Sequence, residues 1–189
     1  MIGSSYVPTP EELAGRRAIL NIKNFDDNLC FLYSILASLH PAKSNQNHVS
    51  SYRRYLPELK YDGLEFPLKV TDVPKFEQMN PAISVNVIVH DEEEEDFFPI
   101  YMSPNRDRQH HVNLLLLTPF PYGDQSHYTL IRSLSKLVAR RTKHTNKTFV
   151  CEYCLHPFAQ EHCLESHLPN CRIHKPQAVQ MPTDNVMKF

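Results

Sequence analysis

The sequence has no run of about eighteen apolar residues, the length that crosses a bilayer as a helix. Its start, MIGSSYVPTPEELAGRR, has no basic segment followed by an apolar core, so it lacks a secretory signal. These absences argue against membrane-spanning and secreted proteins, and we expect an intracellular protein of the nucleus or the cytoplasm. Tryptophan is absent and glycine is scarce, but neither shortage decides a fold.

The chain as a whole also lacks an excess of charge of either sign. A formal net charge of -1 argues against a nucleic-acid surface that extends over the whole chain. This average hides a division, because residues 132–175 contain eight Lys or Arg against three Glu and are therefore +5. With 189 residues and 41% apolar content, the chain is long enough for one packed domain and a small appendage.

The hydrophobic pattern predicts an α+β domain over residues 18–139. Apolar residues recur at helical spacing over 29–39, after the polar turn NFDD, and an amphipathic helix is predicted at 47–59. Because these helices precede the strands, we expect an α+β domain with a helix packed on an antiparallel sheet. The segments with strand character are 18–22, 83–89, 97–103, 110–118 and 127–134.

Composition divides the rest of the chain. Two prolines near the start favour a flexible leader, and six consecutive acidic residues at 91–96 predict a solvated loop. A basic stretch leads out of the domain toward a cysteine-rich segment. The expected order is a leader at 1–17, the domain at 18–139, a basic linker at 140–148, a zinc finger at 149–174 and a tail at 175–189.

Four of the five cysteines lie near the end of the sequence, at spacings typical of a metal site. The pattern is C-x2-C-x12-H-x3-C, and its members are Cys151, Cys154, His167 and Cys171. Such thiolate and imidazole ligands suit Zn2+, which they hold in a tetrahedron. His167 and Cys171 are four positions apart and share one helix face. We therefore predict a ββα C2HC finger with structural zinc, and Cys163 is an alternative ligand.

The helix of this finger is poorly suited to reading DNA bases. The positions that would face the bases are Gln160, Cys163 and Ser166, and acidic residues flank them. One finger covers only about three base pairs. Basic residues at 140–147 can contact phosphates without sequence preference. A structural or docking finger is therefore favoured, and non-specific nucleic-acid binding remains the alternative.

The fifth cysteine, Cys30, lies where a polar turn meets the apolar helix. A helix N-terminus stabilises a thiolate, and its N–H groups can bind an oxyanion. A catalytic thiol also needs a histidine base, and His127 at the start of a strand is the candidate. Asn24, six residues before Cys30, is the candidate oxyanion amide, and Asp27 is the alternative. The opposing interpretation is a core thiol without chemistry.

The residue that would orient His127 is left open by the sequence. Asp124 is close to it in the chain, and Asn113 lies on the neighbouring predicted strand. His110 and His111 are further candidates for the base, although both also suit a solvated strand end.

Several segments in one order resemble the N-terminal region of family-B DNA polymerase-like proteins of Maverick or Polinton-type DNA transposons. The resemblance covers about residues 20–175. It also extends to the tail MPTDNVMKF, which is similar to the run-in to the exonuclease domain of those proteins. No acidic exonuclease or polymerase motif is present, so the resemblance implies a front module without polymerase activity. The segments are NIKNFDDNLCFLYSILASLHP, FPLKVTDVPKFEQMN, ISVNVIV, HHVNLLLL, HYTLIRSLSKLV and FVCEYCLHPFAQEHCLESHLPNC.

The resemblance implies a papain-like cysteine peptidase, similar to deubiquitinase-type modules, that acts on a ubiquitin-like or other protein substrate. Cys30 then matches the nucleophile, His127 the base and Asn24 the oxyanion residue. Ovarian-tumour-type proteases carry D-G-N-C at the nucleophile, where this chain has DNLC, and a polar residue two after the histidine, here Thr129. The alternative function is a non-catalytic module that binds nucleic acid or protein.

Overall fold

The fold is taken from a computed structural model, which describes residues 6–91, 96–117, 126–138 and 148–173. Most of the predicted acidic loop, nearly all of the basic linker, the tail and Asp124 lie outside the described residues. Among the described residues, no helix is both long and apolar enough to cross a membrane.

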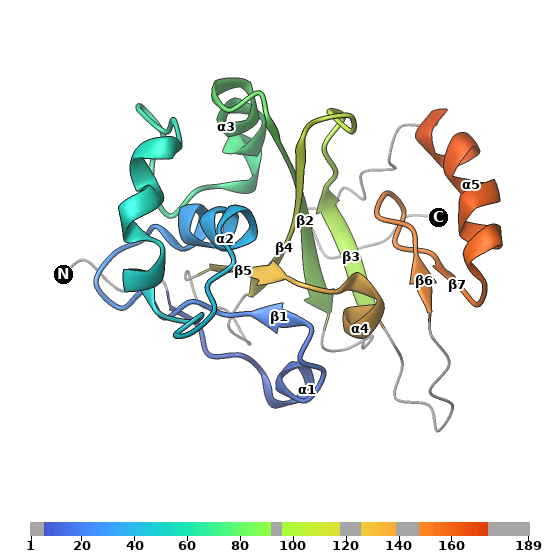
Figure 1. The fold of residues 1–189 in the computed structure, drawn as a ribbon, viewed down its shortest axis with the longest axis horizontal. Coiled ribbons are helices and arrows are strands. Elements are labelled where there is room, and N and C mark those ends of the chain that lie inside the picture. The colour runs from blue at the N-terminus through green and yellow to red at the C-terminus, as the bar shows by residue number, and fades with distance from the viewer. Residues whose placement is uncertain (1–5, 92–95, 118–125, 139–147, 174–189) are drawn as a thin grey trace, which may run out of the picture.

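A mixed five-stranded sheet forms the centre of the molecule, in the order β1-β5-β4-β2-β3 (Figure 1). The prediction of an antiparallel sheet is wrong for one pair, because β2 and β4 run parallel. β3 folds back antiparallel to β2, and the chain then returns so that His110 lies opposite Ile83. The strands are β1 (Ile19–Leu20), β2 (Ile83–Asp91), β3 (Asp96–Tyr101), β4 (His110–Leu117) and β5 (His127–Ile131).

Helix α2 (Cys30–Leu39) covers one face of the sheet, as the helical spacing predicts (Figure 1). Its residues from Cys30 to Ala37 are all buried, and all except Ser34 belong to the same core cluster as Tyr128 and Leu114. Phe31 contacts the ring of Tyr128 edge-on, with centroids 5.1 Å apart. Because nearly every side of α2 is covered, its core contribution is dispersion and apolar burial, at about 25 cal/mol per Å2.

Two further segments pack on the α2 side. The helix predicted at 47–59 is instead formed by two short 3-10 helices, η1 (Val49–Ser51) and η2 (Arg53–Glu58). Pro57 lies inside η2, and proline removes a backbone donor that an α-helix needs. A third 3-10 helix, η3 (Val70–Asp72), leads into α3 (Val73–Met79).

The opposite face of the sheet carries α1 (Glu11–Ala14), α4 (Leu134–Val138) and the cysteine-rich finger. Residues 6–17 were expected to form a flexible leader, but the structure packs them on the domain. Val7 and Leu13 are buried in the second core cluster, together with Ile88 and Leu115 of the sheet. Their apolar side chains explain the packing. The two nearby prolines led to the prediction of a flexible leader.

Candidate metal centre and thiol site

The cysteine-rich finger has the expected ββα order, with β6 (Phe149–Val150), β7 (Pro157–Phe158) and α5 (Glu161–Ile173). The loop between the two strands carries Cys151 and Cys154. It closes through a hydrogen bond from the Leu155 N–H to the Cys151 carbonyl, 2.9 Å long. Leu155 has a positive φ of 59°, which turns the chain back toward β7. This tight turn points both thiols toward α5.

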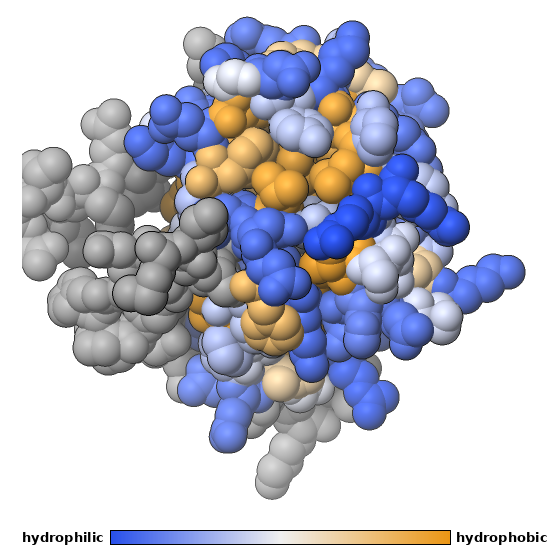
Figure 2. Space-filling model, turned by 90° about the vertical axis from the view of Figure 1, so that its left-hand side faces the viewer, coloured by the Kyte–Doolittle hydropathy of each residue, from blue (hydrophilic) through white to orange (hydrophobic). Residues whose placement is uncertain are grey.

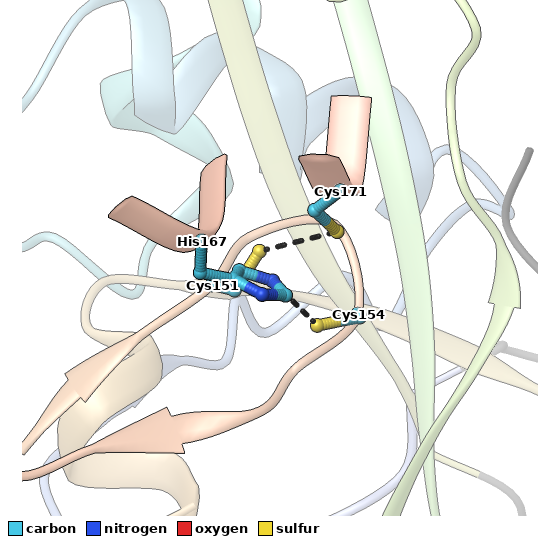
Figure 3. A group of neighbouring side chains, drawn as sticks. All are labelled: Cys151, Cys154, His167 and Cys171. Carbon is cyan, nitrogen blue, oxygen red and sulfur yellow. Dashed lines mark hydrogen bonds between the residues drawn. The ribbon is translucent and has the colours of Figure 1, made fainter. Parts of the chain in front are cut away.

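The four predicted ligands come together, as Figure 3 shows. Their ligand atoms all lie within 4.8 Å of one another, so the group is close enough to hold a metal ion. Cys151 Sγ is 3.7 Å from Cys171 Sγ, and Cys154 Sγ is 3.3 Å from His167 Nε2. A tetrahedral zinc site with Zn–S of about 2.3 Å and Zn–N of about 2.0 Å has edges of about 3.8 and 3.6 Å.

Without a cation, such a cluster of thiols resists ionisation. Burial, followed by the neighbouring Cys151 thiol, raises the pKa of the Cys171 thiol to about 12. Burial also raises the pKa of Cys154. A bound cation reverses this effect, because it stabilises coordinating thiolates directly. The donor set therefore fits a metal ion of the soft or borderline class.

Cys163, the alternative ligand, does not belong to this group among the described residues. Its thiol is exposed and lies 3.5 Å from His162 Nε2 on the outer side of α5. The outward positions Gln160, Glu161 and Glu165 are exposed as well. Two carboxylates on this face would repel DNA phosphates.

Besides the apolar packing of its buried residues in the second core cluster, the finger is held on the main domain by polar contacts. Asn86 of β2 donates from Nδ2 to the Glu152 carbonyl at 3.0 Å, next to the ligand Cys151. Arg106 donates to the carbonyl of Cys171, and its guanidinium lies 4.1 Å from the ring centroid of Tyr153. Both sides of the ligand set, the loop and the helix, are therefore tied to the main domain.

Cys30 is the first residue of α2, where the sequence places it, and its side chain is fully buried. One turn later, Ser34 donates from Oγ to the carbonyl of Tyr128 at 3.1 Å. Burial raises the pKa of Tyr128, and negative charge on Cys30 raises it further, so the thiol lies close to this part of β5. The start of α2 thus packs beside the first residues of β5.

His127 is the first residue of β5 and is fully buried. Its Nε2 lies 2.8 Å from Oδ1 of Asn21, a residue that the sequence reasoning did not single out. Asn21 donates from Nδ2 to the Val7 carbonyl and to Thr9 Oγ1, at 2.9 and 3.0 Å. These two bonds fix the direction of the amide, so its oxygen accepts from the ring. The neutral ring then carries its proton on Nε2 and a lone pair on Nδ1.

A series of ring contacts connects His127 with the loop that leads into α2. The Tyr6 ring lies edge-on to His127, with centroids 5.4 Å apart, and edge-on to Phe25 at 4.8 Å. Phe25 precedes Cys30 by five residues. The register pairs His127 with Leu117, which belongs to the second core cluster. The histidine therefore lies at the end of the sheet near the start of α2, and its side chain leaves the strand on the finger side.

The turn before α2 is held by Asn24 and Asp27. Asn24 is buried and donates from Nδ2 to the Asp27 carbonyl at 3.0 Å. Asp27 Oδ1 accepts from the Leu29 N–H at 3.0 Å, and Oδ2 accepts from the Tyr33 hydroxyl at 2.8 Å. Burial, followed by this hydrogen bond, raises the pKa of Tyr33 to about 12. In this structure both predicted oxyanion candidates brace the turn.

The other candidates for the thiol site lie elsewhere. Asn113 accepts a hydrogen bond from Asn86 at 3.0 Å, beside the finger junction and away from Asn21. His111 belongs to the same junction, 2.7 Å from Ser84 Oγ, and burial lowers its pKa. Thr129, two residues after His127, donates to the Leu115 carbonyl at 3.3 Å.

Only the pairing of β1 with β5 brings Asn21 to His127, and no local signal in the sequence indicates that pairing. A comparison with family models, curated proteins and solved structures finds no match to this chain, so the site rests on its own geometry.

Proposed function

We propose that the chain is a thiol-dependent peptidase or deubiquitinase-like protein with a papain-like arrangement and a structural zinc finger. The observation that carries the proposal is the hydrogen bond between His127 Nε2 and Asn21 Oδ1. It identifies Nε2 as the protonated nitrogen, and we propose Nδ1 as the base, at the end of the sheet where α2 begins with Cys30. A relation to the N-terminal region of Maverick or Polinton polymerase-like proteins belongs to the same proposal and rests on the shared order of motifs.

In the proposed reaction, His127 Nδ1 takes the proton of the Cys30 thiol, and the thiolate attacks the carbonyl carbon of a peptide or isopeptide bond. The amine leaves with the proton from His127, and a thioester remains on Cys30. Water then loses a proton to His127 and attacks the thioester. The acid is released, and the thiol regains its proton. Asn21 is a positioning residue, because it holds the ring through Nε2.

The backbone N–H groups at the start of α2 are the proposed donors to the oxyanion, and Asn24 is the proposed side-chain donor. To donate to the oxyanion, the Asn24 amide must first release its hydrogen bond to the Asp27 carbonyl. Proton transfer also requires that the His127 ring reach the thiol around the first residue of β5. The second requirement is a movement of the ring from the finger side of the sheet toward the α2 side.

Zinc is the ion that we propose for Cys151, Cys154, His167 and Cys171, because three thiolates and one imidazole suit it best. All four positions are filled by protein ligands, which is typical of structural sites. Its role is then to stabilise the finger against the sheet, at a distance from the thiol chemistry.

An electrophilic ubiquitin probe at neutral pH tests the proposal. We expect a covalent adduct with the wild-type protein and none with Cys30→Ala, while Cys163→Ala, which removes an exposed thiol outside the ligand group, retains it. Iodoacetamide alkylation of Cys30 against pH should give a thiol pKa below the usual value of about 8.5, and His127→Gln should raise it. An unreactive Cys30 in a folded, metal-loaded protein contradicts the proposal.

The second candidate function is a non-catalytic module that binds nucleic acid or protein, and the +5 charge of residues 132–175 favours it. Salt-dependent DNA binding that is lost on charge reversal at Arg140 and Arg141 would support this function. That result together with an unreactive Cys30 would replace the first proposal.

A further inference from the structure

A basic groove lies beside the loop that leads into α2. Its volume is about 670 Å3, and it opens between this loop and the 3-10 helices η1 and η2. Figure 2 views the molecule from the side on which these segments lie and shows strongly hydrophilic side chains next to hydrophobic surface. The groove is lined by Lys23, Phe25, Asp26, His48, Val49, Ser50, Arg53 and Arg54.

The charge of this groove is opposite to that of the chain as a whole. Its lining contains three Lys or Arg and one Asp, whereas the chain carries -1. A second groove of about 500 Å3 shares Ser50 and Arg54 with the first and adds Lys43 and His40. Arg54 is held over the Tyr55 ring, 4.7 Å from its centroid, and that ring stacks on His40 at 3.9 Å. An extended anionic ligand could therefore contact basic residues of both grooves.

Ring contacts place the basic groove next to the proposed thiol site. Phe25, a lining residue, is 58% exposed and contacts Tyr6, whose ring contacts His127. Arg53 lies 4.0 Å from Asp27 Oδ2, in the turn that leads to Cys30. A chain that occupies the groove therefore passes close to the start of α2.

We infer that the basic groove binds an acidic segment of the peptide substrate, an inference that rests on the proposed peptidase function. Lys23, Arg53 and Arg54 would pair with carboxylates, and Phe25 and Val49 would contact apolar side chains between them. A peptide suits this lining better than a nucleic acid does. Asp26 in the groove and Asp27 beside it would repel a continuous row of phosphates, whereas an acidic segment with spaced charges avoids them.

The test measures binding by fluorescence anisotropy, with the full chain carrying Cys30→Ala so that no turnover occurs. The labelled probe is a peptide in which glutamates alternate with leucines, and the matched peptide has glutamine in place of glutamate. A thymidine oligonucleotide of equal charge is the third ligand. The groove variant is Lys23→Glu with Arg54→Glu, which spares Arg53 and its contact with Asp27.

We expect the glutamate peptide to bind, the glutamine peptide to bind at least about tenfold more weakly, and the groove variant to lose a similar factor. The control Lys60→Glu with Lys69→Glu makes the same charge change at exposed positions outside the groove and should bind like the parent. Equal loss in both variants, tighter oligonucleotide binding, or no peptide binding overturns the inference.

A further readout separates this inference from the proposed function. In wild-type protein, the glutamate peptide should slow alkylation of Cys30 by iodoacetamide, because it would occupy the groove beside the turn that leads to Cys30. Peptide binding that leaves this rate unchanged overturns the assignment of the groove to the thiol site. A reactive Cys30 without any peptide binding leaves the peptidase proposal intact and removes only the groove.

Discussion

The two faces of the sheet are covered in different ways. On the α2 face, eight consecutive helix residues, Cys30 to Ala37, are buried, and all of them except Ser34 belong to an apolar cluster. On the other face, Val150 and Leu155 of the finger join the second core cluster, and hydrogen bonds run to the finger backbone from Asn86 and Arg106. Packing alone can maintain the first face. The finger on the second face is a small unit whose own core is minimal, so the order of the finger is conditional on the metal ligands.

Metal removal should produce the largest difference between the two faces of the sheet. With a strong chelator, or in Cys151→Ser, we expect bound metal to be lost and residues 148–173 to exchange amide hydrogens rapidly, while residues 30–39 stay protected. Structural zinc supplies about 10–16 kcal/mol of apparent binding free energy in isolated fingers, so the finger should not stay folded without it. Metal analysis and hydrogen exchange check this, with Cys163→Ser as the matched control. Simultaneous loss of protection on both faces would show that the faces are one cooperative unit.

A smaller effect is expected at the junction itself. Asn86 is buried, donates to the Glu152 carbonyl and accepts from the Ser103 N–H at 3.0 Å. Asn86→Ala leaves these groups without their partner and should cost roughly 1–3 kcal/mol of unfolding free energy in urea. Exchange should accelerate in the finger and remain unchanged in α2. Gln160→Ala, on the exposed side of the finger, is the control and should behave like the parent.

The smallest effect concerns a hydroxyl on the α2 face. Tyr33→Phe removes the hydrogen bond to Asp27 and should cost about 1 kcal/mol at neutral pH. Because folding raises the Tyr33 pKa from 10.0 to about 12, the unfolded chain loses this proton first. The stabilisation is therefore fully present below pH 10 and is lost as pH rises toward 12. Unfolding free energies measured from pH 8 to 11 should fall more steeply in wild type than in Tyr33→Phe, and parallel curves would contradict the assignment.

Local patterns in the sequence predicted the parts that depend on local physics. The helix at 29–39 and the ligand spacing of the finger are encoded by residues close to one another in the chain, and the structure has both. The prediction of an α-helix at 47–59 is wrong. The periodicity of this segment suits an α-helix, but the structure has two 3-10 helices there, with Pro57 inside the second.

Long-range features were not accessible from local patterns. The parallel pairing of β2 with β4 follows from the return of the chain after β3, and periodicity does not reveal which neighbour a strand selects. The sequence pattern did not indicate the contact of Asn21 with His127 for the same reason, since the pairing of β1 with β5 brings the two residues together. The sequence offered Asp124, close to His127 in the chain, and Asn113, on the neighbouring predicted strand, as orienting residues, whereas the amide that contacts His127 is Asn21.

The pairing of β1 with β5 also sets the order in which this domain can be completed as it folds. Ile19 lies opposite Ile131, 112 positions later in the chain. Closing a loop of that length is entropically costly and slow compared with forming α2, whose contacts are local. During synthesis, β1 must therefore wait until β5 has left the ribosome, and the Asn21–His127 contact forms only then. Every intermediate before that point has α2 available but lacks the group that fixes the tautomer of the proposed base.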